Sequence, residues 1–276
     1  VQIGGLNVLS ILLISIVFPL IILSEWKKKS DYQGVLGLYL LLQATLIGAV
    51  CSQDMFSMFF FWSLSAFPVY FLVAYWGGTH REAAASGYIL TAALGNAFFL
   101  AALFLVYYSQ VPHTFSLAEL SGGVFADKSI GFLGMQMPVS LLAFVLFTLA
   151  FAFRVPVWPL NRWFSTLLGQ APCSTVVFFS GVFVPVSLVV YLNIVYSLFP
   201  AEVIKYSNVM LILGAINMFV AALGIVSKKT LWSFLASLSL LQMGFFLVGI
   251  GSVELSSVLG LVLQATFFGI AISALG

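Results

Sequence analysis

Residues 144–191 read FVLFTLAFAFRVPVWPLNRWFSTLLGQAPCSTVVFFSGVFVPVSLVVY, a long apolar run that is interrupted near its middle and then resumes. The interruption contains Arg154, Pro156 and Pro159. Proline removes a backbone donor and clashes with the preceding turn, so the pattern predicts a broken helix. Inside a bilayer such a break persists only where protein or water satisfies the freed backbone groups. Arg154 is therefore a candidate ion-path residue that faces other helices rather than lipid.

The composition of the chain is that of a membrane protein. Hydrophobic residues make up 62%, charged residues 7%, and the mean hydropathy is +1.17. Because a membrane-spanning helix needs about 20 residues, the sequence predicts an all-α, polytopic transmembrane bundle of nine helices in one domain, residues 1–276. The predicted helices cover about 6–25, 33–52, 55–76, 84–108, 136–166 (the broken one), 173–198, 208–226, 231–250 and 257–276. Only residues 109–135 form a joint long enough for a structured surface loop, and Asp54 is expected to cap the helix that begins after it.

The basic residues predict the orientation in the membrane. Seven Lys and Arg residues fall on one side and two on the other, and positive charge favours the cytoplasmic side. The larger group comprises Lys27, Lys28, Lys29, Arg81, Arg162, Lys228 and Lys229, and the smaller group comprises Lys128 and Lys205. The N-terminus is thus expected outside, with the first basic loop in the cytoplasm or, in an organelle, the matrix.

Motifs of soluble enzymes are absent from the sequence. There is no Gly-rich phosphate loop, no His-Glu-x-x-His motif and no nucleophile elbow. His80 and His113 lie in polar joints, and Cys51 and Cys173 lie in or beside apolar runs without ligand spacing. The sequence therefore predicts no catalytic residue, no cofactor, no metal site and no nucleic-acid partner.

Several segments resemble motifs of one membrane family. They are residues 59–70 with 76–78 and Arg81, residues 152–156 with 159–163 and 170–172, and residues 239–245 with 263–269. This pattern resembles the antiporter-like subunits of respiratory complex I, in particular the M-type subunit, with relatives in membrane-bound hydrogenases and Mrp antiporters. The resemblance runs in order from the family's third helix to its eleventh. It implies an integral membrane protein of the bacterial cytoplasmic or mitochondrial inner membrane whose partners are lipids and other subunits of a larger complex.

The ionisable residues of the family pattern are replaced here. The family carries a glutamate where this chain has Ser63, a lysine where it has Arg154, and a second, buried lysine where it has Pro185. Two family histidines are replaced by Asn161 and Gln242. Ser63 cannot ionise, arginine is a poor proton carrier because it stays protonated, and Pro185 removes the next relay group and is expected to introduce a kink. A continuous protonatable path therefore cannot be drawn through the side chains.

Two functions remain open at this point. The first is a degenerate antiporter-like subunit of a complex I-type NADH:quinone oxidoreductase, structural rather than catalytic, with little or no proton translocation. The second is an ion or bicarbonate transport subunit of a related complex, with Arg154 as an anion or gating charge. An independent enzyme has no support from the residues.

The polar residues also have simpler interpretations. Arg154 would satisfy the carbonyls freed by Pro156 and Pro159, and Gln242 would form an ordinary interhelical hydrogen bond of about 0.6 kcal/mol.

The sequence begins at Val1 without a methionine and ends inside an apolar run, as part of a longer protein would. Since helices at both ends of the family pattern are not matched, we expect the chain to be stable only within an assembly.

Overall fold

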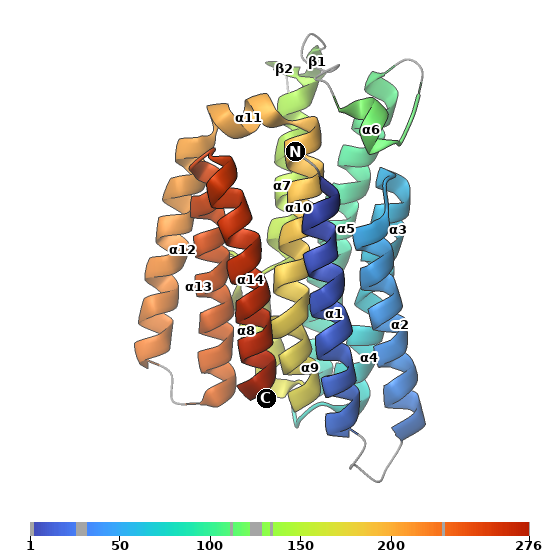
Figure 1. Cartoon of the computed structure of the whole chain (residues 1–276), viewed down its shortest axis with the longest axis vertical. Helices are drawn as coiled ribbons and strands as arrows, with labels where there is room; N and C mark the ends of the chain where they lie inside the picture. The colour runs from blue at the N-terminus through green and yellow to red at the C-terminus, as the bar shows by residue number, and fades with distance from the viewer. Residues whose placement is uncertain are drawn as a thin grey trace.

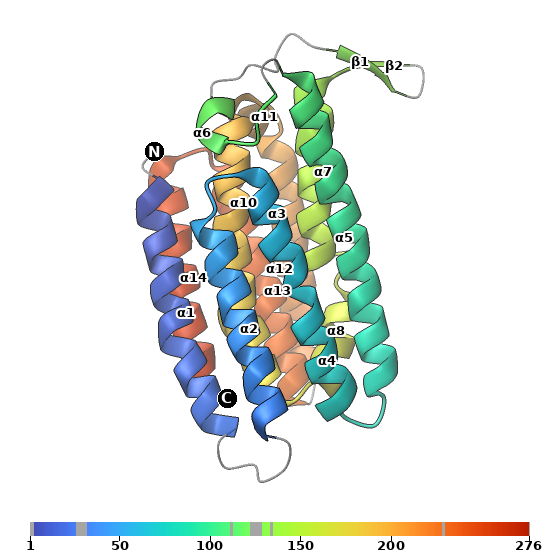
Figure 2. The same cartoon turned by 90° about the vertical axis from the view of Figure 1, so that its right-hand side faces the viewer.

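The computed structural model describes residues 3–25, 32–110, 113–121, 129–132, 135–227 and 230–275, which form a bundle of long helices (Figures 1 and 2). The elements are α1 (Ile3–Glu25), α2 (Tyr32–Cys51), α3 (Met55–Leu64), α4 (Ala66–Trp76), α5 (Arg81–Ser109), α6 (Leu117–Leu120), β1 (Ser129–Phe132), β2 (Met135–Pro138), α7 (Val139–Arg154), α8 (Arg162–Gln170), α9 (Cys173–Phe178), the π-helical turn η1 (Phe179–Phe183), α10 (Val184–Leu198), α11 (Pro200–Lys205), α12 (Ser207–Ser227), α13 (Leu231–Gly251) and α14 (Leu255–Leu275). The predicted all-α transmembrane bundle is confirmed. The antiparallel pair β1–β2 and the short α6 form in and beside the predicted surface loop.

Eight helical segments in the described ranges are long and apolar enough to cross a membrane, with α3 and α4 together forming one of them. The predicted broken helix is also present. Its first part, α7, ends at Arg154, and its second part, α8, begins at Arg162. The assignment of the chain to helices three to eleven of the family pattern, as a single domain, stays a prediction.

The segment formed by α3 and α4 begins and bends where its sequence dictates. The Asp54 carboxylate accepts hydrogen bonds from the N–H groups of Phe56 (3.3 Å) and Ser57 (2.9 Å), so the predicted cap is confirmed. The helix is interrupted at Ser65, between α3 and α4. Pro68, in the first turn of α4, has no N–H to continue the ladder across this point.

A helix that is buried along almost its whole length occupies the centre of the bundle. It comprises α9, η1 and α10 and runs from Cys173 to Leu198, with α10 visible in the middle of Figure 1. The helices α1, α2, α4, α7, α13 and α14 all contact it. This helix therefore meets neighbouring helices on every side, whereas the outer helices also present apolar side chains to lipid.

Pro185 is accommodated without interrupting the central helix. Its ring removes the backbone donor that would bond to the carbonyl four residues earlier, that of Gly181. The backbone widens into η1 just before this point and continues as α10 to Leu198, as insertions of one residue into a helix do. The Gly181 carbonyl lies against Gly269 of α14 so closely that a Cβ atom at Gly269 would clash with it.

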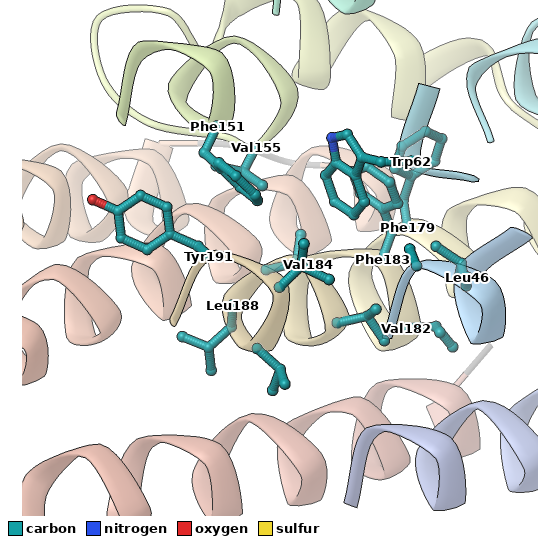
Figure 3. Packing of buried hydrophobic residues seen from close by; sticks show 14 of the residues in the cluster. Leu46, Trp62, Phe151, Val155, Phe179, Val182, Phe183, Val184, Leu188 and Tyr191 are labelled. Atoms are coloured by element: carbon teal, nitrogen blue, oxygen red, sulfur yellow. The ribbon is translucent and has the colours of Figure 1, made fainter. Parts of the chain in front are cut away.

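Aromatic and branched side chains fill the core around the central helix (Figure 3). Trp62 stacks on Phe183 with ring centroids 5.2 Å apart, and Phe151 packs edge-on against Tyr191 at 5.1 Å. Aromatic pairs of this kind contribute about 0.5–1.5 kcal/mol each beyond their buried area. The middle of the bundle is consequently apolar and densely packed.

The helix ends are arranged as the predicted orientation requires. The C-terminal ends of α1 and α12 and the N-terminal end of α5 lie at the lower end of the bundle in Figures 1 and 2. The short α11, which carries Lys205, lies at the upper end. The lysines at positions 27–29, 128, 228 and 229 fall outside the described residues.

Candidate functional site

Arg154, at the end of α7, is fully buried, with 1% of its surface exposed. Its Nη2 donates to the Trp62 carbonyl at 3.1 Å and to the Ser65 hydroxyl at 2.8 Å. The guanidinium lies 5.0 Å from the centre of the Trp62 ring and 5.4 Å from that of Phe183. Arg154 thus faces protein rather than lipid, as its membrane depth demands, and two aromatic faces stabilise its charge.

The position of Arg154 follows from two local features. A Cβ atom at Gly95 would lie 3.0 Å from the Arg154 Cγ and 2.8 Å from the Ala150 carbonyl, so α5 lies directly against the α7 backbone and covers the arginine stem. On the other side, Ser65 donates its own hydroxyl to the Trp62 carbonyl at 2.6 Å. The interruption between α3 and α4 therefore presents a carbonyl and a hydroxyl together to the guanidinium.

Ser65 is a site residue that the sequence does not single out, whereas Ser63, at the position of the family's glutamate, is the candidate that the resemblance indicates. In the structure the Ser63 hydroxyl is buried without a hydrogen-bond partner, and Ser65 makes the contact with Arg154. The sequence signal for Ser65 was Pro68, three residues later, because it interrupts the helix at this point. The predicted role of Arg154 also needs correction: it bonds a carbonyl of α3, not those freed by Pro156 and Pro159.

The other predicted site residues lie apart from Arg154. Asn161, at the start of α8, lines a separate cavity of about 130 Å³ between α8, α12 and α13. Gln242 is buried on α13, and neither residue bonds to Arg154. Pro185 is buried on the central helix. The structure therefore does not gather these residues into one polar path.

The break itself is held by a residue that sequence reasoning did not select. Asn217 of α12 is fully buried; its Oδ1 accepts from the Trp158 backbone N–H at 2.7 Å, and its Nδ2 donates to the Leu240 carbonyl at 3.0 Å. It connects the break to both α12 and α13. The available signal was an asparagine inside an apolar run, a residue type that hydrogen-bonds across helices in membranes.

Several buried donors around the guanidinium have no hydrogen-bond partner. They are Nε and Nη1 of Arg154, the Tyr88 hydroxyl and the Trp163 indole N–H. The Tyr88 ring, on α5, is 5.6 Å from the rings of both Trp163 on α8 and Phe179 in η1. Phe179 also packs against Phe183, which lies beside the Arg154 guanidinium.

Among the residues that the structure describes, no acidic side chain lies at the depth of Arg154. Within the described ranges, each Asp, Glu, Lys or His of a membrane-spanning helix lies in the first or last two residues of that helix. In those ranges no group of three or more His, Cys, Asp or Glu residues could hold a metal ion. The arrangement therefore fixes a positive charge in the core but places no proton acceptor of comparable depth beside it.

Two polar pockets lie at opposite ends of the central helix. One, of about 280 Å³, is lined by Glu25 and by Cys173 and Ser174 at the start of α9. The other, of about 340 Å³, is lined by Asn193 near the end of α10 and by Asn7. At 1.5 Å per residue, Ser174 and Asn193 are about 28 Å apart along the helix. The apolar core of Figure 3, with Phe179, Val182 and Phe183, lies between them.

Comparison with known proteins identifies a family of membrane subunits. Residues 52–275 match the family described as NADH:quinone oxidoreductase/Mrp antiporter, TM. The chain is 30% identical over 274 residues to an NAD(P)H-quinone oxidoreductase chain 4 of Picosynechococcus sp., covering 99% of this chain and 49% of that protein. It is also 30% identical to the chloroplastic chain 4 of Chlorokybus atmophyticus, covering 97% and 50%. The chain thus spans about half the length of the relatives it matches.

Solved structures share the fold. The Mrp complex from Dietzia sp. contains a chain with a TM-score of 0.81 and 19% identity, matched over 98% of this chain and 49% of that one. Respiratory complex I from Thermus thermophilus contains a chain with a TM-score of 0.76 and 21% identity, matched over 97% and 55%. At these identities the likeness concerns the arrangement of the helices.

Proposed function

The chain belongs to the NADH:quinone oxidoreductase/Mrp antiporter transmembrane family, and on this premise we propose that it is an antiporter-like membrane subunit of a complex I-type NAD(P)H:quinone oxidoreductase. We further propose that it keeps its place in the assembly without translocating protons. The names of the relatives, chain 4 of NAD(P)H-quinone oxidoreductases, support the first part. The chemistry of the buried site supports the second part.

One observation carries the second part: Arg154 is bound only to neutral groups, the Trp62 carbonyl and the Ser65 hydroxyl. Proton transfer through a membrane requires groups whose protonation changes when their partners change. Arginine stays protonated in proteins, and neither a carbonyl nor a serine hydroxyl ionises at physiological pH. The site can therefore hold a charge but cannot pass a proton on.

The structure of the central helix points the same way. Pro185 occupies the position of the family's buried lysine and carries no ionisable group. Its neighbours Val184 and Val186 are buried with it. The two polar pockets at the ends of this helix are separated by a core that contains Phe179, Val182 and Phe183, and the buried Ser180 and Ser187 between the pockets carry hydroxyls that do not ionise at physiological pH.

The alternative, an ion or bicarbonate transport subunit, rests on a different feature of the same residue. A buried cation with unused N–H groups attracts an anion rather than a proton. Transport, however, needs a passage that joins the two sides of the membrane. The packed aromatic core around Trp62 and Phe183 favours the non-translocating subunit.

The test compares proton stoichiometry in membranes that contain the assembled complex. The chain is tagged, co-purifying subunits are identified by mass spectrometry, and protons moved per electron pair are measured after reconstitution into vesicles. Arg154→Ala is compared with Ser63→Ala, whose hydroxyl bonds to nothing. In assembled complexes we expect the same stoichiometry as in the unchanged protein. A reduced stoichiometry in Arg154→Ala with assembly intact would identify a working transporter, and a stable monomer in mild detergent would contradict the subunit role.

A further inference from the structure

The guanidinium of Arg154 has more donors than its surroundings accept. Arginine carries five N–H donors and no acceptor. Only Nη2 is used, toward two neutral oxygens, while Nε and Nη1 have no hydrogen-bond partner. A buried charge in this state is costly unless it is paired. The surroundings of Nε and Nη1 must therefore supply an acceptor.

The unused groups nearby are also donors. Tyr88 on α5 and Trp163 on α8 are at least nine-tenths buried, and neither the Tyr88 hydroxyl nor the Trp163 indole N–H has a hydrogen-bond partner. The indole N–H can only donate. The Tyr88 ring lies 5.6 Å from the rings of Trp163 and Phe179. Phe179 in turn packs against Phe183, whose ring centre lies 5.4 Å from the Arg154 guanidinium. Three elements, α5, α7 and α8, thus bring donors without partners into the same neighbourhood as a buried positive charge.

We propose that Arg154, Tyr88 and Trp163 bind a small monovalent inorganic anion that acts as the counter-ion of the guanidinium. One such anion can accept several N–H and O–H bonds at once and neutralise the charge. Within the described ranges no carboxylate lies at this depth to do so. The anion would neutralise the guanidinium charge as a buried carboxylate would, but unlike a carboxylate it would not carry a proton. This inference does not rest on the proposed function, since a bound anion is compatible with a silent subunit and with a transporter.

Chloride is the probe for the test. The protein is purified from its own membranes in mild detergent, with its partner subunits attached, and gluconate is replaced by chloride at constant ionic strength. Thermal unfolding of this chain is followed by light scattering or by loss of the tagged subunit from the complex. We expect a saturable stabilisation by chloride, and also by bromide, because the anion binds the folded state.

Conservative variants test whether Arg154, Tyr88 and Trp163 bind the chloride that stabilises the protein. Tyr88→Phe and Trp163→Phe each remove one donor but keep a ring, and each should raise the midpoint chloride concentration about tenfold, as loss of a hydrogen bond to a charged group does. Tyr191→Phe is the matched control, because its hydroxyl lies 3.0 Å from the Thr148 hydroxyl instead. Its midpoint should equal that of the unchanged protein.

Two results would overturn the proposal. The first is the absence of a saturable chloride effect in the unchanged protein. The second is the same chloride midpoint in Tyr88→Phe, Trp163→Phe and Tyr191→Phe. Arg154→Gln should abolish the chloride effect altogether. If Arg154→Gln does not assemble, the two phenylalanine variants still decide, because both preserve the charge of Arg154 and keep an aromatic ring at the substituted position. The measurement is of stability, so its outcome is separate from that of the proton-flux experiment.

Discussion

At the scale of single residues, Ser65 and Ser63 lie two positions apart and have different surroundings. The Ser65 hydroxyl bonds both Arg154 and the Trp62 carbonyl, whereas the Ser63 hydroxyl bonds to nothing. We expect Ser65→Ala to reduce the free energy of unfolding by about 1.5–3 kcal/mol, the value of a hydrogen bond to a charged group. Ser63→Ala should change it by less than about 0.5 kcal/mol.

Thermal or denaturant unfolding of the detergent-solubilised protein measures this difference, and each serine is the control for the other. Equal losses for Ser65→Ala and Ser63→Ala would show that the guanidinium is not held at this point. A larger loss for Ser63→Ala would move the site back to the position that the sequence suggested.

The sequence predicted the residue at the centre of the site but not its partners. Arg154 stands out because a charge beside two prolines in an apolar run must face protein. Which serine it meets depends on the interruption between α3 and α4, which changes the direction of the side chains after Leu64. Almost every residue of this run is apolar, so its periodicity does not show which side chains point toward Arg154 and which point toward lipid. Tyr88 and Trp163 read as ordinary membrane aromatics, and only their missing partners distinguish them.

At the scale of helices, the break between α7 and α8 depends on Asn217. We expect Asn217→Leu to destabilise the protein by about 1–3 kcal/mol, because the Trp158 N–H and the Leu240 carbonyl would both lose the partner that the fully buried Asn217 provides. Asn96→Leu on α5 is the control, since the Asn96 Oδ1 has no hydrogen-bond partner. Thermal unfolding of both variants checks this, and similar losses would mean that Asn217 does not hold the break.

The crossing of α14 over the central helix gives a second prediction for the helices. Gly269→Ala would push a methyl group into the Gly181 carbonyl, and overpacking of this kind costs about 1–3 kcal/mol. Gly260→Ala, in the same helix, meets nothing within 4 Å and should be neutral or slightly stabilising. Melting temperatures of the two variants measure the difference. Tolerance of Gly269→Ala equal to that of Gly260→Ala would contradict the close approach.

Most helices were predictable because a membrane demands long apolar runs, and the polar joints mark their ends. The break was predictable because Pro156 and Pro159 follow a charged residue and each removes a backbone donor within one turn of the other. The π-helical turn before Pro185 was not, since a proline in an apolar run is equally compatible with a kink. The turn lies beside the close contact between Gly181 and Gly269, and the sequence pattern does not show that these two distant residues meet.

At the scale of the whole molecule, the distribution of basic residues predicts that the bundle lies in the membrane with its more basic end inside. In a background without Cys51 and Cys173, we expect Ser227→Cys and Ala83→Cys to react with an impermeant maleimide from one side of the membrane. Ala201→Cys, on α11, should react from the other side. All three positions are exposed. Reaction of Ser227→Cys and Ala83→Cys from opposite sides would contradict the orientation.

The broken helix also has a consequence for how a ribosome delivers this chain to the membrane. A helix of 16 residues, the length of α7, measures about 24 Å, short of the roughly 30 Å hydrocarbon layer, and it ends in a charge. Its partner α5 has already been translated when α7 emerges, so those two can pair at once. Asn217 is 59 residues downstream of Trp158. The Trp158 N–H therefore cannot donate its hydrogen bond to Asn217 until α12 has been translated. Nascent chains that stop after α10 should therefore hold α7 against α5 but leave the segment beyond Arg154 unsecured.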